Sequence, residues 1–377
     1  MFCSNCSILL PSIRRLGLRM ASSSNYVSRV RLFDYWQQND HALEAEFEQS
    51  KAVVMIDKEP LVKKDGHSME LVQFETADLR TKLNLYGLDL HPEINSCLLG
   101  LAEPSIEHND YRPIFGIAIR TMEPPVDSGI DARQLRRQLS SELGGRFENL
   151  RMAMLSLTSE EDRFLLARFQ ALTRWYMIFR RCPTCTSPLR LRVSKCAARC
   201  IRCERDYYPT LSPVAICLVR DEANERCLLV RHQSSVPTVY TNVAGFASLG
   251  ETLEETVRRE VAEEVGIEVQ DIRSVNLSQP WPMPFSSLMV GFTAIGDPNH
   301  SLDICRDELE AAQWFEREEV RAAYEKTEAD PMLKEPLKWI RQLQAGNSLD
   351  VDPSSLLYIP PKGAIAHQMI KRWLFES

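Results

Sequence analysis

The sequence predicts an α/β (α+β) fold, in which a mixed β-sheet is sandwiched between helices. Short apolar runs typical of buried strands alternate with amphipathic stretches of helical period. Strands that alternate with helices favour a mixed sheet covered on both faces. Two cysteine pairs and a glutamate-rich helix interrupt this alternation, which indicates metal sites within the fold. With 377 residues, the chain is long enough for two or three domains with cores of their own.

The overall composition is ordinary for a globular protein, with 44% hydrophobic and 26% charged residues. The formal net charge of −7 shows no basic nucleic-acid face in bulk and leaves a local basic patch open. No apolar run approaches the roughly 20 residues that a membrane-spanning helix needs, so no membrane partner is expected. Of the eleven cysteines, five lie between Cys182 and Cys203, which indicates metal binding in a reducing compartment.

Residues 1–33 have a composition typical of a mitochondrial presequence, with five arginines, seven serines and no acidic residue. The alternatives are a disordered tail or a translation start at Met20. A mitochondrial location is therefore predicted, and a cytoplasmic or peroxisomal location is the alternative. The final residues Phe375-Glu376-Ser377 do not match a peroxisomal SKL-type address.

Residues 35–150 predict a separate α+β domain. Apolar stretches at Lys51–Val62 and Met69–Glu75 flank the hairpin turn signal Lys64-Asp65-Gly66. Later elements are two strands and a helix that ends at paired glycines: Ser96–Ala102, Ile114–Arg120 and Asp131–Leu143. Nothing here has metal or nucleophile spacing. A regulatory domain, a dimerisation surface and a degenerate copy of the catalytic fold therefore all remain open.

A linking helix is expected over residues 155–180. Thr158 and Glu161 have the spacing of a capping box at its start. Apolar residues then recur at helical spacing: Leu165, Phe169, Leu172 and Tyr176. This stripe favours core or interdomain packing over a ligand site.

Residues 181–209 carry two CxxC pairs separated by fourteen residues: Cys182, Cys185, Cys200 and Cys203. Each pair lets two thiolates meet one tetrahedral ion, and four thiolates leave no open position for catalysis. The spacing therefore predicts a structural Zn²⁺ ribbon. A redox dithiol pair is the alternative. Reduced core cysteines fit less well, because the intervening residues are strongly basic.

Residues 210–345 are expected to form the catalytic domain, and residues 346–377 a C-terminal segment that completes the substrate site. A hairpin is predicted from Val214–Arg220 and Arg226–His232 around a polar turn. Later strands are expected at Ile272–Leu277 and Leu288–Ile295. Helices are expected at Phe315–Ala329, Leu333–Gln344 and Ala364–Trp373.

The densest pattern lies in Gly245–Ile267, which reads GFASLGETLEETVRREVAEEVGI. Thr252 and Glu255 form a capping-box pair, so a helix is expected to begin near Leu253. Gly266 suits the left-handed position that ends such a helix.

Three glutamates of this helix, Glu260, Glu263 and Glu264, are expected to share one face. Like charges repel there, whereas Mg²⁺ or Mn²⁺ requires several carboxylate oxygens. Arg259 can hold a carboxylate in a bidentate fork. The alternative is a solvated glutamate-rich helix, which the number of fixed positions disfavours. The pattern is a full match to the Nudix box, a loop–helix–loop that hydrolyses nucleoside diphosphates linked to another group.

The segment Ser278–Ser286 holds three prolines and a tryptophan, so it predicts a stiff loop. Such a loop loses little conformational entropy on binding. A rigid Trp281 wall beside Gln279 and Ser286 suits a flat ring with an amide or a sugar–phosphate. A proline-rich packing loop is the alternative.

Together, the ribbon, the segment Tyr207-Tyr208-Pro209, the box and this loop resemble the NADH pyrophosphatase subfamily of the Nudix hydrolases, also described as NAD-capped RNA hydrolases. The resemblance covers residues 155–375 by motif and the N-terminal domain by arrangement. It implies a Nudix fold behind a zinc ribbon and an N-terminal Nudix-like domain, Mg²⁺ or Mn²⁺, and a homodimer. It also implies cleavage of NADH to AMP and reduced nicotinamide mononucleotide. Removal of NAD caps from RNA is the alternative, and a non-catalytic RNA- or protein-binding module is the second.

The resemblance also implies site residues at the matching positions. The implied metal ligands are the Ala244 carbonyl, Glu260, Glu264 and Glu308. The implied substrate contacts are Tyr208, Phe246, Gln279, Pro280, Trp281, Pro282, Met283, Pro284, Phe285, Ser286 and Ala366. Glu263 is the candidate for activating water, and Arg259 completes the catalytic set. Met283 replaces the family's usual Phe and Thr210 its usual Arg, so the preference among NADH, NAD⁺, NADPH and capped RNA stays open.

Overall fold

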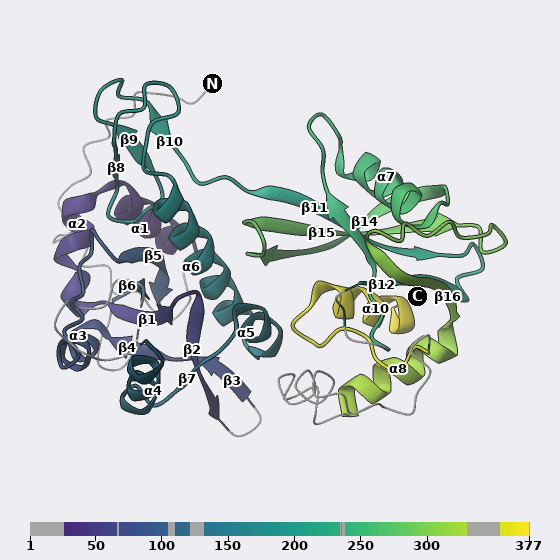
Figure 1. Cartoon of the computed structure of the whole chain (residues 1–377), viewed down its shortest axis with the longest axis horizontal. Coiled ribbons are helices and arrows are strands. Elements are labelled where there is room, and N and C mark those ends of the chain that lie inside the picture. Colours follow the sequence, from purple (N-terminus) through teal and green to yellow (C-terminus); the bar gives the residue numbers. More distant parts are fainter. Residues whose placement is uncertain are drawn as a thin grey trace.

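The computed structural model describes residues 26–65, 68–104, 110–120, 132–233, 235, 238–329 and 355–376. They form two lobes, each built on a mixed sheet (Figure 1). Residues 1–25 of the predicted presequence lie outside the described residues. Its remaining residues belong to helix α1 (Tyr26–Gln38), which packs Leu32 and Phe33 against the N-terminal core. No helix in these ranges is long and apolar enough to cross a membrane.

The N-terminal lobe has the strand order β3-β2-β1-β6-β5, with β4 paired to β1 and β7 to β2. Its strands are β1 (Lys51–Ile56), β2 (Glu59–Asp65), β3 (Ser68–Leu71), β4 (Gln73–Glu75), β5 (Ser96–Ala102), β6 (Arg112–Ile119) and β7 (Arg146–Phe147). The apolar stretch Lys51–Val62 is two strands, because Asp57 and Lys58 both take positive φ, 47° and 74°, in a tight turn. The predicted hairpin after it is confirmed by the pairing of β2 with β3.

Helices cover both faces of this sheet: α2 (Asp40–Ala45), η2 (Phe47–Gln49), α3 (Thr76–Asn84), α4 (Ala132–Glu142), α5 (Leu150–Ser156) and α6 (Glu160–Ile178). Side chains alternate along β1, so Val53 faces the α5–α6 core while Val54 faces the α1, α3 and α4 core. The predicted cap of α6 is wrong by one residue. Ser159 accepts from the N–H of Asp162, because Oγ1 of Thr158 accepts from Met69 N instead.

The second lobe, called the catalytic lobe because it holds the catalytic domain predicted from the sequence, has the strand order β14-β15-β11-β12-β16, with β13 paired to β11. Its strands are β11 (Ser212–Arg220), β12 (Arg226–His232), β13 (Val243–Phe246), β14 (Val269–Trp281), β15 (Ser287–Gly296) and β16 (Leu309–Glu316). Helix α7 (Leu253–Val265) covers one face, and α8 (Arg317–Ala329) and α10 (Ile365–Phe375) cover the other (Figure 1). The predicted helix at Phe315 begins too early, because Phe315 pairs with Cys227 in the sheet. The predicted helix Leu333–Gln344 lies outside the described residues.

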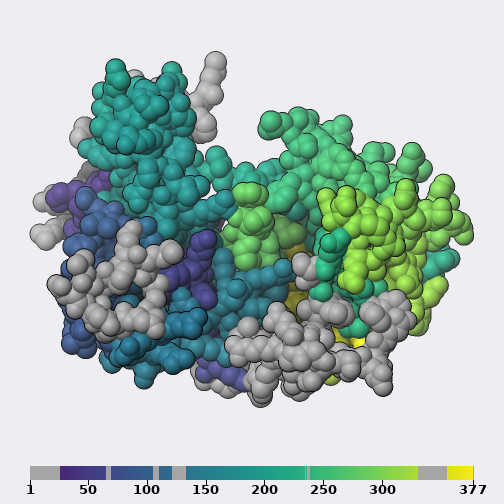
Figure 2. Space-filling view, in the orientation of Figure 1, coloured from purple at the N-terminus to yellow at the C-terminus, as the bar shows by residue number. Residues whose placement is uncertain are grey.

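The two lobes meet at the tip of the β14–β15 hairpin, and a notch separates them above it (Figure 2). The predicted loop Ser278–Ser286 is in part wrong, because β14 continues to Trp281, which pairs with Ser287. Trp281 and Met283 pack against the α5–α6 core of the other lobe. Arg174 of α6 also donates a hydrogen bond to the Pro284 carbonyl. The proline-rich hairpin is therefore both part of the catalytic sheet and the joint between the lobes.

Candidate active site and zinc centre

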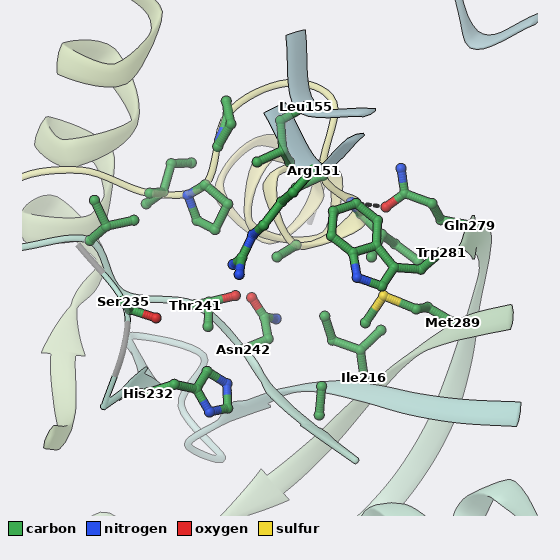
Figure 3. Close-up of a pocket in the computed structure, with 18 of the residues that line it drawn as sticks. Arg151, Leu155, Ile216, His232, Ser235, Thr241, Asn242, Gln279, Trp281 and Met289 are labelled. Atoms are coloured by element: carbon green, nitrogen blue, oxygen red, sulfur yellow. Dashed lines mark hydrogen bonds between the residues drawn. The ribbon is translucent and has the colours of Figure 1, made fainter. Parts of the chain in front are cut away.

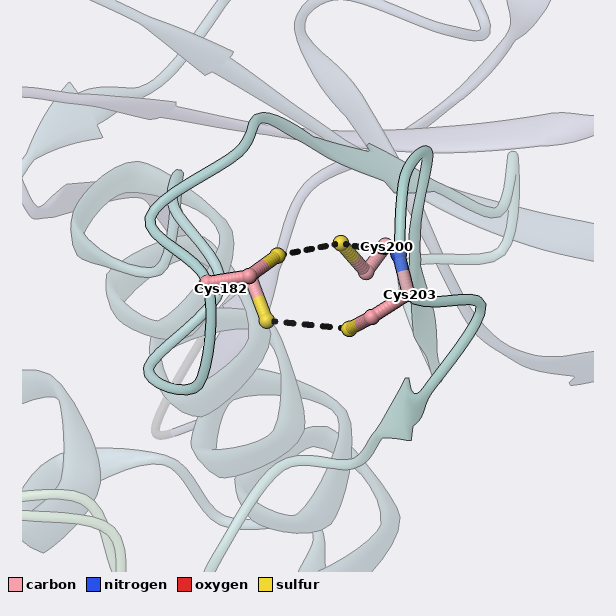
Figure 4. A group of neighbouring side chains, drawn as sticks. Cys182, Cys200 and Cys203 are labelled. Carbon is pink, nitrogen blue, oxygen red and sulfur yellow. Dashed lines mark hydrogen bonds between the residues drawn. The ribbon is translucent and has the colours of Figure 1, made fainter.

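The two cysteine pairs meet at one point of the ribbon formed by β8 (Leu189–Leu191), β9 (Ala198–Cys200) and β10 (Asp206–Tyr207) (Figure 4). The four Sγ atoms all lie within 4.8 Å of one another. The Sγ atoms of Cys182 and Cys203 are 3.6 Å apart, and those of Cys185 and Cys200 are 3.4 Å apart. One compact set of four sulfurs, in place of two separate dithiols, fits tetrahedral Zn²⁺.

The thiol of Cys182 is prepared for such an ion. Partial burial pushes its pKa upward, but hydrogen bonds outweigh this and lower the pKa to about 6. The largest of them comes from the Tyr207 hydroxyl, 3.0 Å from the sulfur. Metal ligands must be thiolates, so this environment favours the binding form near neutral pH. Cys196 stands apart and donates to the Gln37 carbonyl.

Helix α7 begins and ends where the sequence predicted. Thr252 accepts from the N–H of Glu255, and the carboxylate of Glu255 accepts from the N–H of Thr252, which completes the capping box. Gly266 ends the helix in the left-handed region at φ 72°. Val261, on its apolar face, is buried against the sheet. This packing holds the helix in place, so the side chains on its polar face keep a fixed position.

The three glutamates of α7 lie in different environments. Glu264 is only 2% exposed, and its Oε2 has no hydrogen-bond partner among the described residues. Burial, followed by the charges of Glu260 and Glu308, raises the pKa of Glu264 to about 8. Burial also raises the pKa of Glu260. Glu263 lies at the solvent edge, where its side chain is 62% exposed, and it accepts from the same Arg259 nitrogen as Glu260.

Glu260, Glu264 and Glu308 together are called the acidic group below. Strand β13 lies against this group at Gly245, which contacts Glu260. A Cβ atom at Gly245 would lie 1.9 Å from Cδ of Glu260, so a glycine here leaves room for that carboxylate beside the strand. The preceding residue, Ala244, borders the adjoining cavity. The sequence spacing of box glycine and box glutamate therefore has a direct steric cause.

Arg259 holds the surrounding carboxylates in place. Its guanidinium grips Glu251 in the predicted bidentate fork, at 2.6 and 3.0 Å. It also donates to Glu260 at 2.8 Å and to Glu263 at 2.9 Å. The hydrogen bonds from Arg259 lower the pKa of Glu251 to about 2. Arg259 is thus a positioning residue that fixes the acidic group.

The acidic group fits a divalent cation. The charges of Glu260 and Glu308 add to burial in raising the pKa of Glu264, and the buried Oε2 of Glu264 has no partner among the described residues. A cation would satisfy that oxygen and compensate the charges. Within the described ranges only the four cysteines converge tightly, so the glutamate oxygens are spread more widely. This spread suits Mg²⁺ or Mn²⁺, which also take water and phosphate oxygens as ligands.

A cavity of roughly 430 Å³ lies between the lobes (Figure 3), and Ala244, next to Gly245, is part of its lining. Its walls are largely apolar, from Ile216, Trp281 and Met289, and the predicted contacts Gln279 and Ala366 also line it. Its size and character match a small-molecule site. The amide of Gln279 is already used by the fold, because it donates to Gly363 O at 2.6 Å and accepts from Ile365 N at 2.8 Å.

The other predicted substrate contacts do not all converge on this cavity. A second hollow, between α6, the ribbon and the hairpin, is lined by Tyr208, Pro280, Trp281, Pro282 and Ser286. Neither hollow includes the remaining four: Phe246, Met283, Pro284 and Phe285. The exposed rings of Phe246 and Phe285 meet edge to face at 6.1 Å, with Arg174 over the latter. Of the residues that the structure describes, only Trp281 borders both hollows.

Sequence reasoning missed five polar residues of the cavity: Arg151, His232, Ser235, Thr241 and Asn242. Their side chains point into the space beneath the C-terminal segment (Figure 3). Arg151 comes from α5 of the other lobe, so no local motif could have identified it. Burial, and then the charge of Arg151, lowers the pKa of His232. The N-terminal lobe therefore contributes to the lining of this cavity.

Comparisons with known proteins agree with this geometry. The NUDIX domain family model matches residues 210–339. "NAD-capped RNA hydrolase ndx-9" of Caenorhabditis elegans is 47% identical over 364 residues, covering 96% of this chain and 94% of its own length. "NAD(P)H pyrophosphatase NUDT13, mitochondrial" of mouse is 34% identical over 93% of this chain and 92% of its own length. "NAD-capped RNA hydrolase NudC" of Mycobacterium bovis is 38% identical over 44% of this chain and 46% of its own length.

Proposed function

Because the chain belongs to the NADH pyrophosphatase and NAD-capped RNA hydrolase subfamily of the Nudix hydrolases, we propose that it hydrolyses the diphosphate bond of NADH to AMP and reduced nicotinamide mononucleotide. NAD⁺ and NADPH are related substrates of the same site. The single observation that carries the proposal is Glu264, a buried carboxylate near Glu260 and Glu308 whose Oε2 has no partner within the described ranges. A buried carboxylate destabilises the fold unless its charge is compensated, and a bound cation would compensate it.

The residues in and around the box have separate proposed roles. Glu260, Glu264 and Glu308, with the Ala244 carbonyl, would hold Mg²⁺ or Mn²⁺, which would neutralise phosphate oxygens and stabilise the charge that develops on the leaving group. Arg259 keeps Glu260 in place through its hydrogen bond. Glu263 lies at the open edge, where solvent reaches it, and is our candidate to accept the proton of the attacking water.

Removal of NAD caps from RNA is the second candidate, by the same chemistry. The observation that favours it is the exposed basic surface of the ribbon: Arg181, Arg190, Arg199, Arg202 and Arg205. Phosphate contacts along this surface would be largely independent of base sequence and sensitive to salt. Rates on NADH and on NAD-capped RNA at several salt concentrations separate the two, because only the RNA reaction is expected to slow steeply with salt.

We also propose a homodimer and a mitochondrial location. The dimer is supported by exposed apolar side chains on or beside the second hollow, Phe164, Tyr208 and Leu211. The location is supported by the arginine-rich, acid-free composition of residues 1–33 and by the name of the mouse relative. Size-exclusion chromatography with light scattering and fluorescence microscopy of a C-terminal fusion test these two points.

Glu264→Gln tests the chemistry. With NADH and Mn²⁺, the variant is expected to release AMP roughly 100-fold more slowly or worse, since it removes a charge that acts on the transition state. Glu254→Gln is the matched control, because Glu254 is exposed on the same helix and outside the acidic group. Products are resolved by chromatography. Wild-type turnover in a folded Glu264→Gln variant contradicts the assignment. Wild-type protein that releases AMP from no dinucleotide would instead indicate a non-catalytic RNA- or protein-binding module.

A further inference from the structure

Asn242 is a buried amide that finds no hydrogen-bond partner in the part of the chain that the structure describes. It lies between Thr241 and the start of β13 and is 0% exposed. Neither its Oδ1 nor its Nδ2 has a hydrogen-bond partner among the described residues. Buried polar groups in folded proteins are nearly always paired, because an unpaired one forfeits its hydration without compensation. An amide with both ends unpaired therefore points to a ligand.

The position of Asn242 supports that interpretation. It lines the cavity between the lobes together with the apolar side chains of Ile216, Trp281 and Met289 (Figure 3). These apolar side chains suit a flat ring, and Asn242 is a polar group in the same lining. A ligand that reaches this amide breaks no protein hydrogen bond, because the amide makes none within the described residues.

Gln279 is an internal comparison. It carries the same amide chemistry and lines the same cavity, yet both ends of its amide are bonded to the C-terminal segment, to Gly363 and Ile365. The protein thus uses one cavity amide to build the wall and leaves the other unused. A structural amide is expected to be hydrogen-bonded within the protein, as Gln279 is. An amide that binds a ligand is expected to lack such bonds within the described residues, as Asn242 does.

We propose that Asn242 is a specificity-determining residue that reads the edge of a planar group presenting a donor beside an acceptor. This inference rests on the proposed function, since a nicotinamide dinucleotide carries two such groups. The carboxamide of the nicotinamide ring is one, and the amino group and ring nitrogen of adenine are the other. An asparagine amide pairs with such an edge through two parallel hydrogen bonds.

The test is a set of substrates in which each edge is altered in turn. In 3-acetylpyridine adenine dinucleotide the carboxamide loses its N–H donors, and in nicotinamide hypoxanthine dinucleotide the adenine amino group becomes an acceptor. Wild-type protein is expected to show kcat/KM about 10- to 100-fold lower on one of these two than on NAD⁺, because the altered edge leaves the buried amide unpaired. The disfavoured analogue identifies the ring that Asn242 reads.

Asn242→Leu has a similar shape and no polar atoms. In this variant the discrimination between NAD⁺ and the disfavoured analogue is expected to fall towards one, while the melting temperature stays equal or rises, because an unpaired amide has been removed. Thr238→Val is the matched control. The hydroxyl of Thr238 is also buried and unpartnered within the described residues but lies outside the cavity lining, so its removal leaves the discrimination intact.

Three results overturn the inference. They are discrimination retained in folded Asn242→Leu, no discrimination by the wild type, and failure of both Asn242→Leu and Asn242→Val to fold, which would make the amide structural. None of these is the failure of the proposed function, which appears separately as wild-type protein that releases no AMP from NADH.

Discussion

The two sheets of the molecule have the same connectivity and different chemistry. In each, a strand pairs antiparallel with the next strand in a hairpin, parallel with a later central strand, and antiparallel with a short strand before a helix. These roles belong to β1, β2, β6 and β4 in the N-terminal lobe and to β11, β12, β15 and β13 in the catalytic lobe. Of the three interpretations left open for residues 35–150, this topology supports the degenerate copy.

The difference lies in the helix after the short strand. Helix α3 follows β4 directly, has nine residues and no side-chain cap, and carries Asp78 as its acidic residue. Helix α7 follows a loop, has thirteen residues and a complete capping box, and carries the glutamates of the box. The same backbone scaffold thus holds a catalytic site in one lobe and none of these acidic groups in the other. Chemistry depends on a few side chains rather than on the fold.

The largest effect expected from this comparison is that of Gly245→Ala. The new Cβ would lie 1.9 Å from Cδ of Glu260, and the carboxylate, as the end of a flexible side chain, is what must move. A displacement of about 1 Å in a catalytic group costs on the order of 100-fold in rate. We therefore expect kcat to fall about 100-fold with NADH, while the urea midpoint changes little.

Gly116→Ala is the counterpart in the N-terminal lobe. Its Cβ would lie 2.5 Å from the ring of Phe169, which is fully buried on α6 and has no room to move. Overpacking of this kind costs about 1–3 kcal/mol. Stability is expected to fall while kcat per folded molecule stays unchanged. If both variants lost stability and kept activity, Gly245 would be a packing residue like Gly116.

Much of the fold was predictable because it follows local rules. The hairpin of β11 and β12, strand β5 and the caps of α7 depend on apolar alternation, turn residues and side chain–backbone hydrogen bonds within a few positions. The errors arise where tertiary contacts prevail. Thr158 lost its capping role to a bond with Met69, and Phe315 joined a strand through its partner Cys227.

The residues of the site also fall into two classes, those that local sequence rules predict and those that depend on tertiary contacts. The four cysteines and Gly245 were predictable because one ion or one steric contact fixes their spacing. Arg151 was not, because it reaches the cavity from another lobe, and the unpaired state of Asn242 is a property of the packed structure alone. The use of Gln279 by the C-terminal segment likewise depends on residues about 85 positions away in the chain.

A second prediction compares the buried acids of the two lobes. The pKa of Glu264 is about 8, above its ordinary value of 4.5, so the folded protein holds a proton that the unfolded chain releases. Stability from this group is complete below pH 4.5 and is lost as pH rises to 8, by at most about 1.4 kcal/mol per pH unit. Urea unfolding in buffer free of Mg²⁺ and Mn²⁺ is expected to show this slope, and Glu264→Gln to remove it.

Asp162 of the N-terminal lobe provides the contrast. Burial raises its pKa too, yet its carboxylate accepts from the N–H of Leu71 at 2.9 Å. Asp162→Ala leaves that N–H unpaired and is expected to cost about 1–3 kcal/mol at pH 7, where Glu264→Gln stabilises the metal-free protein. If both variants destabilised the protein, Glu264 would be a structural acid.

The smallest expected effect concerns the caps. Thr252→Ala removes the side-chain acceptor of the α7 capping box and should cost about 1 kcal/mol in urea unfolding. Ser159→Ala removes the cap of α6 in the other lobe and should cost a similar amount. Both helices are also held by buried apolar faces, so neither loss is expected to move Glu260. A loss of kcat in Thr252→Ala comparable to that of Gly245→Ala would contradict this, since it would mean that the cap, and not the packing of Val261, sets the position of the acidic group.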